Sequence, residues 1–556
     1  MSDAPKSDEI LFLPLGGTSE VGMNVYLYGH AGRWLMVDLG IGFADERQPG
    51  VDILVPDVRF ISDQRAKLDG IVVTHAHEDH LGAIPYLWRD LGCPVYASPF
   101  ACAVLRRKLA EFGLLDEVPL IEIPRQGCFD VGPFGLEFIT ITHSIPEPNA
   151  LRITTPVGSL LHTGDWKLDP DPLVGADYDR ARLARLADED ILALIGDSTN
   201  ALVPGHSGSE AEVRGRLLDL VSTLRNRVAV TCFATNVARV ETVARIAEAT
   251  GRRLCIVGRA MKTMVQAAQE CGYLAGMPPV IDEREAGWLP RAELMLLVTG
   301  SQGEARAALS RIARNEHNDI NLEEDDAVIF SSRIIPGNEK AIHAVQNNLL
   351  HKGVQVLTEE DHFVHVSGHP CREELEQMYQ WVQPAIAIPM HGEPRHLLAH
   401  AEIARACQVP QTRVAEDGHV VRLTRAEGAS FQGYVPVGKR AVDGDFLMPL
   451  DRGAVRERRK LAFEGIAVLT LAVDDQGGIA EEPQLTAVGL LPPGDAKKDI
   501  VDQVIDTVER ALQKMSRRDK RNDNAVAETA RVAVRRTLQH VTGHKPVTTV
   551  HVVRID

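Results

Sequence analysis

A dense run of histidines and acids at residues 74–80 constrains the fold of this chain more than any other feature. The run is Thr-His-Ala-His-Glu-Asp-His, and it directly follows the apolar residues 71–73, which predict a short buried strand. Desolvating several imidazoles and carboxylates together is costly, and a bound divalent ion would offset that cost. The alternative is a solvated polar turn in which the histidines occur by chance.

The spacing within the run favours two neighbouring ions over one. His75 and His77 are two residues apart, so on an extended chain they point the same way. Asp79 and His80 are adjacent, so their side chains point in different directions. A run of this spacing after an apolar strand is a stronger indication of a metal site than a lone His-x-His pair.

Four further polar residues follow strand-like apolar runs elsewhere in the chain. They are Asp38, His143, Asp165 and His391. One such residue is more often a polar strand end than a ligand. Four of them, in a chain that also has the dense run, indicate one shared site. Such a site requires the fold to bring residue 391 back beside residue 75.

Counting ligands gives a concrete prediction for this site. We expect His75, His77 and His143 to hold one ion, Asp79, His80 and His391 to hold a second, and Asp165 to bridge them. Imidazoles and carboxylates without cysteine suit zinc or manganese. Two ions about 3.5–4 Å apart can lower the pKa of a shared water and clamp a phosphate. Asp38 then fits a supporting role, orienting ligands or the nucleophile.

Length and composition limit the class of protein. The 556 residues predict roughly two to four domains. Eight cysteines without a CxxC pair are typical of free thiols in a reducing cytoplasm. The polar N-terminus indicates no signal peptide, and no apolar run approaches the roughly 20 residues of a membrane span.

The formal net charge of −17 argues only superficially against a nucleic-acid partner, because binding depends on the local field. Basic residues do gather at 452–460, 514–521 and 531–536. Each of these clusters, taken alone, is more simply interpreted as a solvated helix face or a linker.

Alternating short apolar runs and longer helical patterns predict an α/β protein. Between residues 208 and 370, strand-like runs alternate with helical patterns near 236–249, 261–271 and 338–350, which suggests a parallel sheet flanked by helices. The charged segment 451–460 lacks apolar periodicity and is interpreted as a linker. The remaining residues predict a small α/β domain with strands at 466–471 and 547–553 and helices at about 497–515 and 524–540.

These residues resemble the metallo-β-lactamase superfamily, whose signature is His-x-His-x-Asp-His followed by later His, Asp and His ligands. The resemblance extends to its β-CASP nuclease branch. Asp197 matches the added acid of that branch, His369 its histidine before the last ligand, and His391 its closing histidine. Within the branch the chain is similar to the bacterial ribonuclease J family, which segments 13–17, 299–304 and 335–339 also fit.

The resemblance implies a four-layer αββα metallo-β-lactamase domain interrupted by an inserted α/β β-CASP domain, with a small C-terminal α/β domain. The boundaries expected are 1–207 and 371–450 for the two parts of the metallo-β-lactamase domain, 208–370 for the insertion, 451–460 for the linker and 461–556 for the C-terminal domain.

The resemblance also implies an activity. We expect a metal-dependent ribonuclease that acts as a 5′-to-3′ exonuclease with endonuclease activity in RNA maturation, including rRNA processing, and in mRNA decay. Its expected cofactors are two divalent ions per subunit, zinc or manganese. Its expected partners are single-stranded RNA with a 5′-monophosphate and further copies of itself in a homodimer or homotetramer, in the cytoplasm and without a membrane.

Catalytic roles are implied for Asp38, Asp197 and His369. We expect Asp197 to hold His369, which would stabilise the transition state or protonate the leaving 3′-oxygen. The alternative for His369 is a buried structural histidine.

Substrate contacts are expected at two main segments. His365, Val366, Ser367, Gly368 and His369 would cradle a phosphate next to the metals. Phe233, Ala234 and Thr235 begin a predicted helix, whose N-terminus is a natural phosphate site, although capping by Thr235 or Asn236 explains them equally well. Residues 331–333 (Ser-Ser-Arg) could also touch the RNA backbone.

Three other functions compete with this one. A small-molecule metallo-β-lactamase-fold hydrolase would share the metal ligands but would not need an inserted domain or the Asp197–His369 pair. A non-catalytic RNA-binding scaffold would usually have broken ligands, whereas here all seven are present. A DNA-processing β-CASP nuclease is the closest alternative.

Overall fold

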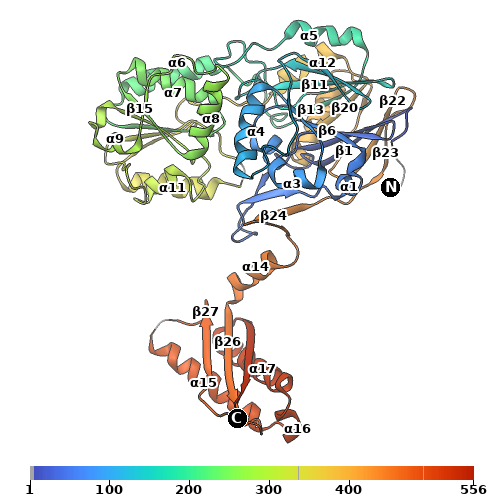
Figure 1. Cartoon of the computed structure of the whole chain (residues 1–556). Coiled ribbons are helices and arrows are strands. Elements are labelled where there is room, and N and C mark those ends of the chain that lie inside the picture. The colour runs from blue at the N-terminus through green and yellow to red at the C-terminus, as the bar shows by residue number, and fades with distance from the viewer. Residues whose placement is uncertain (1–4, 336, 493, 556) are drawn as a thin grey trace. The chain divides into compact units, whose positions relative to one another are not determined.

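The computed structural model describes residues 5–335, 337–492 and 494–555. In this part of the chain the strands form five sheets. The chain divides into two compact units, one made of the residues up to 42 and 55–438, the other of 43–54 and the residues from 439 onward. Figure 1 labels the elements of both units.

Two large sheets form the centre of the first unit. The eight-stranded sheet has the order β23-β22-β1-β2-β3-β6-β7-β8 and the seven-stranded sheet the order β21-β20-β13-β12-β11-β10-β9. The strands of the first sheet are β1 (Ile10–Gly16), β2 (Val25–His30), β3 (Arg33–Val37), β6 (Leu68–Val72), β7 (Val95–Ala97), β8 (Leu120–Glu122), β22 (His419–Thr424) and β23 (Gly428–Tyr434). Those of the second are β9 (Cys128–Val131), β10 (Phe134–Thr140), β11 (Asn149–Thr155), β12 (Gly158–His162), β13 (Ile191–Asp197), β20 (Ile386–Met390) and β21 (Gln411–Thr412).

A largely apolar core lies between these two sheets. Phe12 and Val37 from the eight-stranded sheet are buried against Phe138, Ile195 and Met390 from the seven-stranded sheet. Helices α5 (Arg180–Arg185), α12 (Arg372–Val382) and α13 (Pro394–Ala406) pack on the outer face of the seven-stranded sheet. Helices α3 (Ile84–Leu91) and α4 (Pro99–Glu111) lie beside the other sheet (Figure 1). The expected αββα layers are therefore confirmed.

Strand direction explains why distant residues meet at one edge. Strands β12, β13 and β20 are parallel neighbours, and β3 is parallel to β6. Parallel neighbours end at the same edge of a sheet, where α/β proteins commonly place their sites. The chain leaves β20 at Met390, directly opposite Asp197 at the end of β13. His391 therefore returns to the edge at which the earlier strands end.

The insertion is a separate layer of parallel strands. Its six-stranded sheet has the order β16-β15-β17-β14-β18-β19, and every neighbouring pair is parallel, as the sequence predicts. The strands are β14 (Val228–Thr231), β15 (Arg253–Val257), β16 (Val280–Ile281), β17 (Leu294–Val298), β18 (Ala327–Phe330) and β19 (Gln355–Leu357). The expected helices are present as α7 (Val237–Ala249), α8 (Arg259–Glu270) and α11 (Glu339–His351), with α6 (Glu210–Thr223), α9 (Glu283–Trp288) and α10 (Ala308–Ala313) beside them.

The remaining strands form two small sheets, which belong wholly or mostly to the second unit. The first has the order β25-β24-β5-β4, with β4 (Gly42–Phe43), β5 (Ile53–Pro56), β24 (Lys439–Asp443) and β25 (Phe446–Pro449). The second has the order β27-β26-β28, with β26 (Ile466–Val473), β27 (Gln484–Val488) and β28 (Val547–Arg554). Helices α15 (Asp495–Gln513) and α17 (Asp523–Thr542) pack on β26 and complete the predicted C-terminal α/β domain.

The segment 451–460, interpreted from the sequence as a linker, is largely helical. Most of this segment belongs to helix α14 (Ala454–Glu464). Its arginine, glutamate and lysine residues are good helix formers and need no apolar stripe to form a helix. Val455 is buried, and the Arg458 guanidinium pairs with Asp443 at 2.8 Å. A charged segment without periodicity can therefore be helical when a few contacts hold it.

Candidate metal centre

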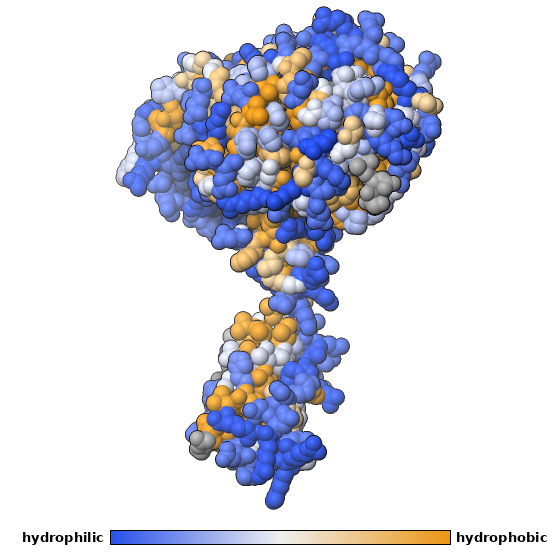
Figure 2. Space-filling view, turned by 45° about the vertical axis from the view of Figure 1, so that its right-hand side comes forward, coloured by the Kyte–Doolittle hydropathy of each residue, from blue (hydrophilic) through white to orange (hydrophobic). Residues whose placement is uncertain are grey.

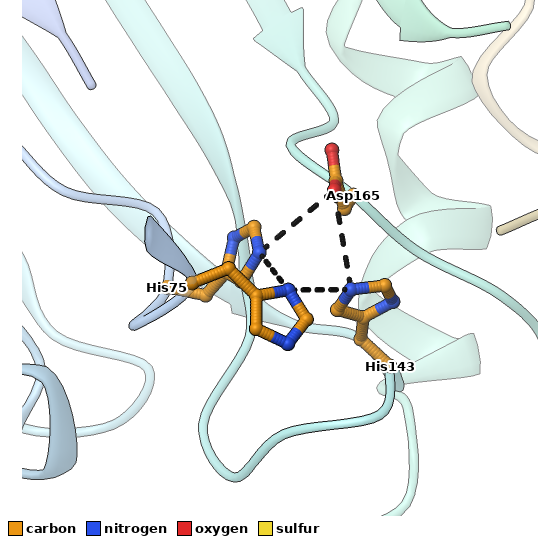
Figure 3. A group of neighbouring side chains, drawn as sticks. His75, His143 and Asp165 are labelled. Carbon is orange, nitrogen blue, oxygen red and sulfur yellow. Dashed lines mark hydrogen bonds and ion pairs between the residues drawn. The ribbon is translucent and has the colours of Figure 1, made fainter. Parts of the chain in front are cut away.

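Three histidines converge at the edge of the sheets and form what we call the first ligand group, His75, His77 and His143. The distance from His77 Nδ1 is 3.0 Å to His75 Nε2 and 3.1 Å to His143 Nε2. Nitrogens bound at zinc distances in a tetrahedron lie about 3.3 Å apart, so this spacing suits a zinc-sized ion. Figure 3 shows the rings of His75 and His143 facing Asp165.

The second ligand group consists of Asp79, His80 and His391. Asp79 Oδ2 lies 3.6 Å from His80 Nε2 and 3.5 Å from His391 Nε2. Asp165 lies between the two groups, because its Oδ2 is 3.2 Å from His80 Nε2 and 3.9 Å from both His75 Nε2 and His143 Nε2. The structure thus brings together all seven residues expected as ligands.

Hydrogen bonds on the far side of the rings fix which nitrogens face the centre. The Nδ1–H of His143 donates to the Gly368 carbonyl at 2.5 Å, and that of His80 donates to Asp38 Oδ2 at 2.7 Å. Each ring then turns its Nε2 toward the centre, an arrangement typical of metal-binding histidines. A side chain at position 368 would collide with His143, since a Cβ there would lie 2.6 Å from its Cε1.

Asp38 lies behind the ligands. Among the members of the two groups, it is hydrogen-bonded to His80. It is fully buried and accepts from Thr74 N at 2.8 Å and Thr74 Oγ1 at 2.9 Å. Its backbone adopts a left-handed conformation, with φ of 62°, and His391 does the same, with φ of 50°. Such conformations cost free energy in non-glycine residues and cluster at functional sites.

The two ligand groups differ in charge. Burial lowers the pKa of His75 and His143 well below the ordinary range and that of His77 to about 4, so the first group is neutral. Burial alone would also lower the pKa of His391, but Asp165 and Asp79 outweigh it and raise this pKa to about 10. The second group is therefore a cluster of ion pairs.

Unsatisfied buried atoms support a missing cation. Both ring nitrogens of His391 and Oδ1 of Asp165 are buried without a well-aligned hydrogen bond, although Asp165 Oδ1 lies only 2.6 Å from His391 Nδ1. Buried polar atoms without partners are rare in proteins, and each needs a reason. A divalent cation would bind one of the two His391 nitrogens together with the Asp165 carboxylate, and the nitrogen and oxygen donors present fit zinc or manganese.

His369 and Asp197 lie beside the ligand groups as a hydrogen-bonded pair. His369 Nδ1 is 2.8 Å from Asp197 Oδ2, and Asp197 Oδ1 accepts from Thr199 N and Oγ1 at 2.9 and 2.8 Å. Burial lowers the pKa of His369, but Asp197 and Asp165 outweigh this effect and raise it. The His369 side chain is 21% exposed, so it can meet a substrate.

The segment 365–368 borders the same place. Ser367 Oγ accepts from Asn200 Nδ2 at 2.7 Å and from His369 N at 3.2 Å. His365 Nδ1 is buried without a partner, whereas the Val366 side chain is buried and could offer a phosphate only its backbone.

The other expected substrate contacts differ in accessibility. Phe233, Ala234 and Thr235 are half-buried in the turn between β14 and α7, and Asn236 caps α7 by accepting from Arg239 N at 2.9 Å. The capping alternative therefore holds for Asn236. Ser331 and Ser332 are buried, whereas Arg333 is exposed, so Arg333 is the one of the three whose side chain is open to solvent.

Two supporting residues were not expected from the sequence. Asn24 Nδ2 donates to Asp79 Oδ2 at 3.3 Å and lies 3.0 Å from His80 Nε2, and Tyr26 O–H donates to Asn24 Oδ1 at 2.7 Å. Glu374, fully buried, accepts from the backbone at Leu168 and Cys371, both at 2.8 Å. Asn24 belongs to no spacing pattern, and Glu374 lies in a run of acids that suggests a solvated helix face.

Models of related protein families match successive parts of the chain. Family models match at 19–206 (metallo-beta-lactamase superfamily), 225–349 (ribonuclease J, beta-CASP domain), 353–410 (Zn-dependent metallo-hydrolase RNA specificity domain) and 453–555 (ribonuclease J C-terminal domain). A solved protein of unknown function from Enterococcus faecalis shares the fold, with a TM-score of 0.51 at 16% identity over 75% of this chain and 100% of its own.

Curated relatives extend over the full length. The chain is 40% identical to ribonuclease J of Sinorhizobium meliloti over 100% of this chain and 99% of that protein. It is 37% identical to ribonuclease J of Thermus thermophilus over 85% of this chain and 84% of that protein. With its domain order, its metal centre and these identities, the chain belongs to the ribonuclease J family.

Proposed function

We propose that the protein hydrolyses RNA phosphodiester bonds with two divalent ions, zinc or manganese, acting from a 5′-monophosphate end and also at internal sites. The observation that carries this proposal is the pair of ligand groups that share Asp165 beside the Asp197–His369 pair. A small-molecule hydrolase would need the ligand groups but not that pair or the inserted domain. RNA maturation and mRNA decay in the cytoplasm are the processes in which such an activity would serve.

In this mechanism, bound divalent ions would activate water and offset negative charge on the phosphate. The chain's own residues do the rest. Burial lowers the pKa of His369 but Asp197 raises it, so the ring can carry a proton and pass it to the leaving 3′-oxygen. Asp197 stabilises the protonated ring and fixes its direction, because Thr199 holds the carboxylate from the other side.

Two segments are suited to hold the RNA backbone. Residues 365–368 offer a hydroxyl, an imidazole and backbone groups next to the catalytic pair, and residues 233–235 precede the N-terminus of α7. Helix N-termini attract anions through unpaired N–H groups and the helix dipole. We assign the 5′-monophosphate and the neighbouring phosphates to these segments.

We further propose that copies of the chain assemble as a homodimer or homotetramer through the second unit. Phe463, Val488 and Val553 are 74%, 60% and 48% exposed there, and Figure 2 shows apolar residues on the visible face of this unit. Exposed apolar patches are typical of interfaces. Truncation after residue 453 should lower the oligomeric state or RNA affinity more than the rate of a single cut. None of the described helices is both long and apolar enough to span a bilayer.

A cleavage assay tests the function. The purified protein is incubated with zinc or manganese and with 5′-monophosphate RNA, DNA of the same sequence, or a β-lactam. We expect cleavage of the RNA, with mononucleotides released from the 5′ end and a slower internal cut on RNA with a blocked 5′ end. Cleavage of DNA without cleavage of RNA would contradict the proposal, as would turnover of the β-lactam alone.

A further inference from the structure

A second concave site lies beside helices α5 and α12. A cavity of about 430 Å³ opens between α5, α12 and the two chain segments that begin near residues 168 and 206. The lining residues used below are Leu168, Tyr178, Arg180, His206 and Trp381. This cavity is large enough for a nucleobase with its ribose and contains none of the metal-ligand residues.

Aromatic rings form one wall of the cavity. The rings of Tyr178 and Trp381 are stacked, with centroids 6.1 Å apart and an angle of 29° between their planes. The guanidinium carbon of Arg180 lies 5.9 Å from the Trp381 ring centroid. Both rings are half-buried and so are partly accessible from the cavity. An aromatic platform beside an arginine is a common way to bind the bases of single-stranded nucleic acids.

The charges around the cavity favour one side for the phosphates of a bound strand. Arg180 and His206 are exposed and can meet a phosphate, whereas Glu212 on another part of the lining would repel one. A base on the aromatic wall would therefore keep its phosphates on the side of Arg180 and His206. An apolar ligand without phosphate would gain nothing from these two side chains.

One buried carboxylate joins the walls of the cavity through hydrogen bonds. Glu374 on α12 accepts from Leu168 N at 2.8 Å, from Ser207 N at 2.9 Å and from Cys371 N at 2.8 Å. Three walls of the cavity are thus joined through one side chain that is fully buried. Preformed walls lower the entropy cost of binding.

The cavity is also close to the metals along the chain. Leu168 follows the shared ligand Asp165 by three residues, which span at most about 11 Å. Cys371 follows His369 by two residues. The Leu168 wall of the cavity is therefore near the ligand groups, and an RNA strand that continues past the metal centre can reach the cavity.

We propose that this cavity binds one base of the RNA strand, stacked on Trp381, while the phosphate to be cut lies at the metal centre further along the same strand. The inference rests on the proposed ribonuclease function and extends it to a base-binding site that is independent of base identity. Every base has a face that can stack, so binding should depend little on sequence.

The test measures RNA binding without cleavage. A fluorescent single-stranded RNA is titrated with the metal-free protein in EDTA, and its anisotropy gives the affinity. We expect Trp381→Leu to bind about 10-fold more weakly and Trp381→Phe to retain most of the affinity, because stacking needs an aromatic face. Trp288→Leu is the matched control, since Trp288 is 91% exposed on α9 and lies outside the cavity; its affinity should not change.

Arg180→Gln provides a second test if Trp381→Leu fails to fold, because the Trp381 side chain also packs against the core. Arg180 is exposed, and its loss should weaken binding several-fold without unfolding. Affinities of the Trp381 and Arg180 variants equal to that of the Trp288 control would overturn the base site while leaving RNA cleavage by the unaltered protein intact. Failure of the unaltered protein to bind or cleave RNA would instead refute the proposed function.

Discussion

The two ligand groups share one sheet edge but differ in charge and in how the chain builds them. The first group is neutral, and hydrogen bonds to Thr74 and Gly368 orient two of its rings. The second group pairs Asp79 with two histidines, and His391 completes it only after the whole insertion. The first group is therefore ready to bind an ion without losing protons. In the second group, an incoming ion must replace the protons of its histidines.

Removing a first-group ligand should have the largest effect. In His77→Ala, the nitrogen that faces both His75 and His143 is lost, so we expect RNA hydrolysis to fall below detection and bound metal to decrease. Metal per chain is measured by mass spectrometry after dialysis. His343→Ala, at an exposed position on α11, is the control and should behave like the unaltered protein. Unchanged turnover in His77→Ala would exclude His77 as a ligand.

Removing the proton donor His369 should have the next largest effect on RNA hydrolysis. It should leave both ligand groups intact. We expect His369→Ala to lower kcat by about 100- to 10,000-fold, because general-acid catalysis contributes on that order. Metal content should stay the same, since His369 is outside both groups. If kcat falls only in proportion to lost metal, His369 is a structural residue.

Substitution of Asn24 should weaken metal binding by one ligand group and not by the other. Asn24 contacts Asp79 and His80 but no member of the first group in the described hydrogen bonds. We expect Asn24→Ala to weaken one of two metal-binding steps by about 10- to 100-fold, the usual cost of losing a residue that orients a ligand. Isothermal titration of metal-free protein measures both steps. Equal weakening of both would show that the groups are not independent.

The smallest expected effect is a pH dependence of metal affinity, which should differ between the two groups because only the second releases protons when it binds metal. In metal-free protein, the raised pKa values of His80 and His391 keep both rings protonated at pH 7, while the lowered values leave the first group neutral. Metal affinity of the second group should therefore rise from pH 6 to 8, and that of the first should not. Titration calorimetry in buffers of different ionisation enthalpy counts the protons. Proton release at both steps would contradict this assignment.

The ligands could be predicted from the sequence because their chemistry shows in short patterns. His75 and His77 follow an apolar strand, and parallel strands of one sheet end at one edge, so Asp165 and His391 could be placed with them. The domain layers followed from the same alternation of strands and helices together with the family resemblance.

Other features depend on contacts that no local pattern records. Asn24 acts through side chains far along the sequence, and Glu374 resembles its exposed acidic neighbours until the fold buries it. Trp381 looks like an ordinary core position on α12, yet it lines a cavity. Helix α14 was missed because a charged helix has no apolar period.

We propose that two ions, one in each ligand group, are needed to cut RNA. Metal-free protein is titrated with zinc or manganese while bound metal per chain and the initial rate of RNA cleavage are measured in the same samples. We expect little cleavage up to one ion per chain and a rate that rises as the second ion binds. Full activity at one ion per chain, or cleavage that survives complete metal removal, would contradict it.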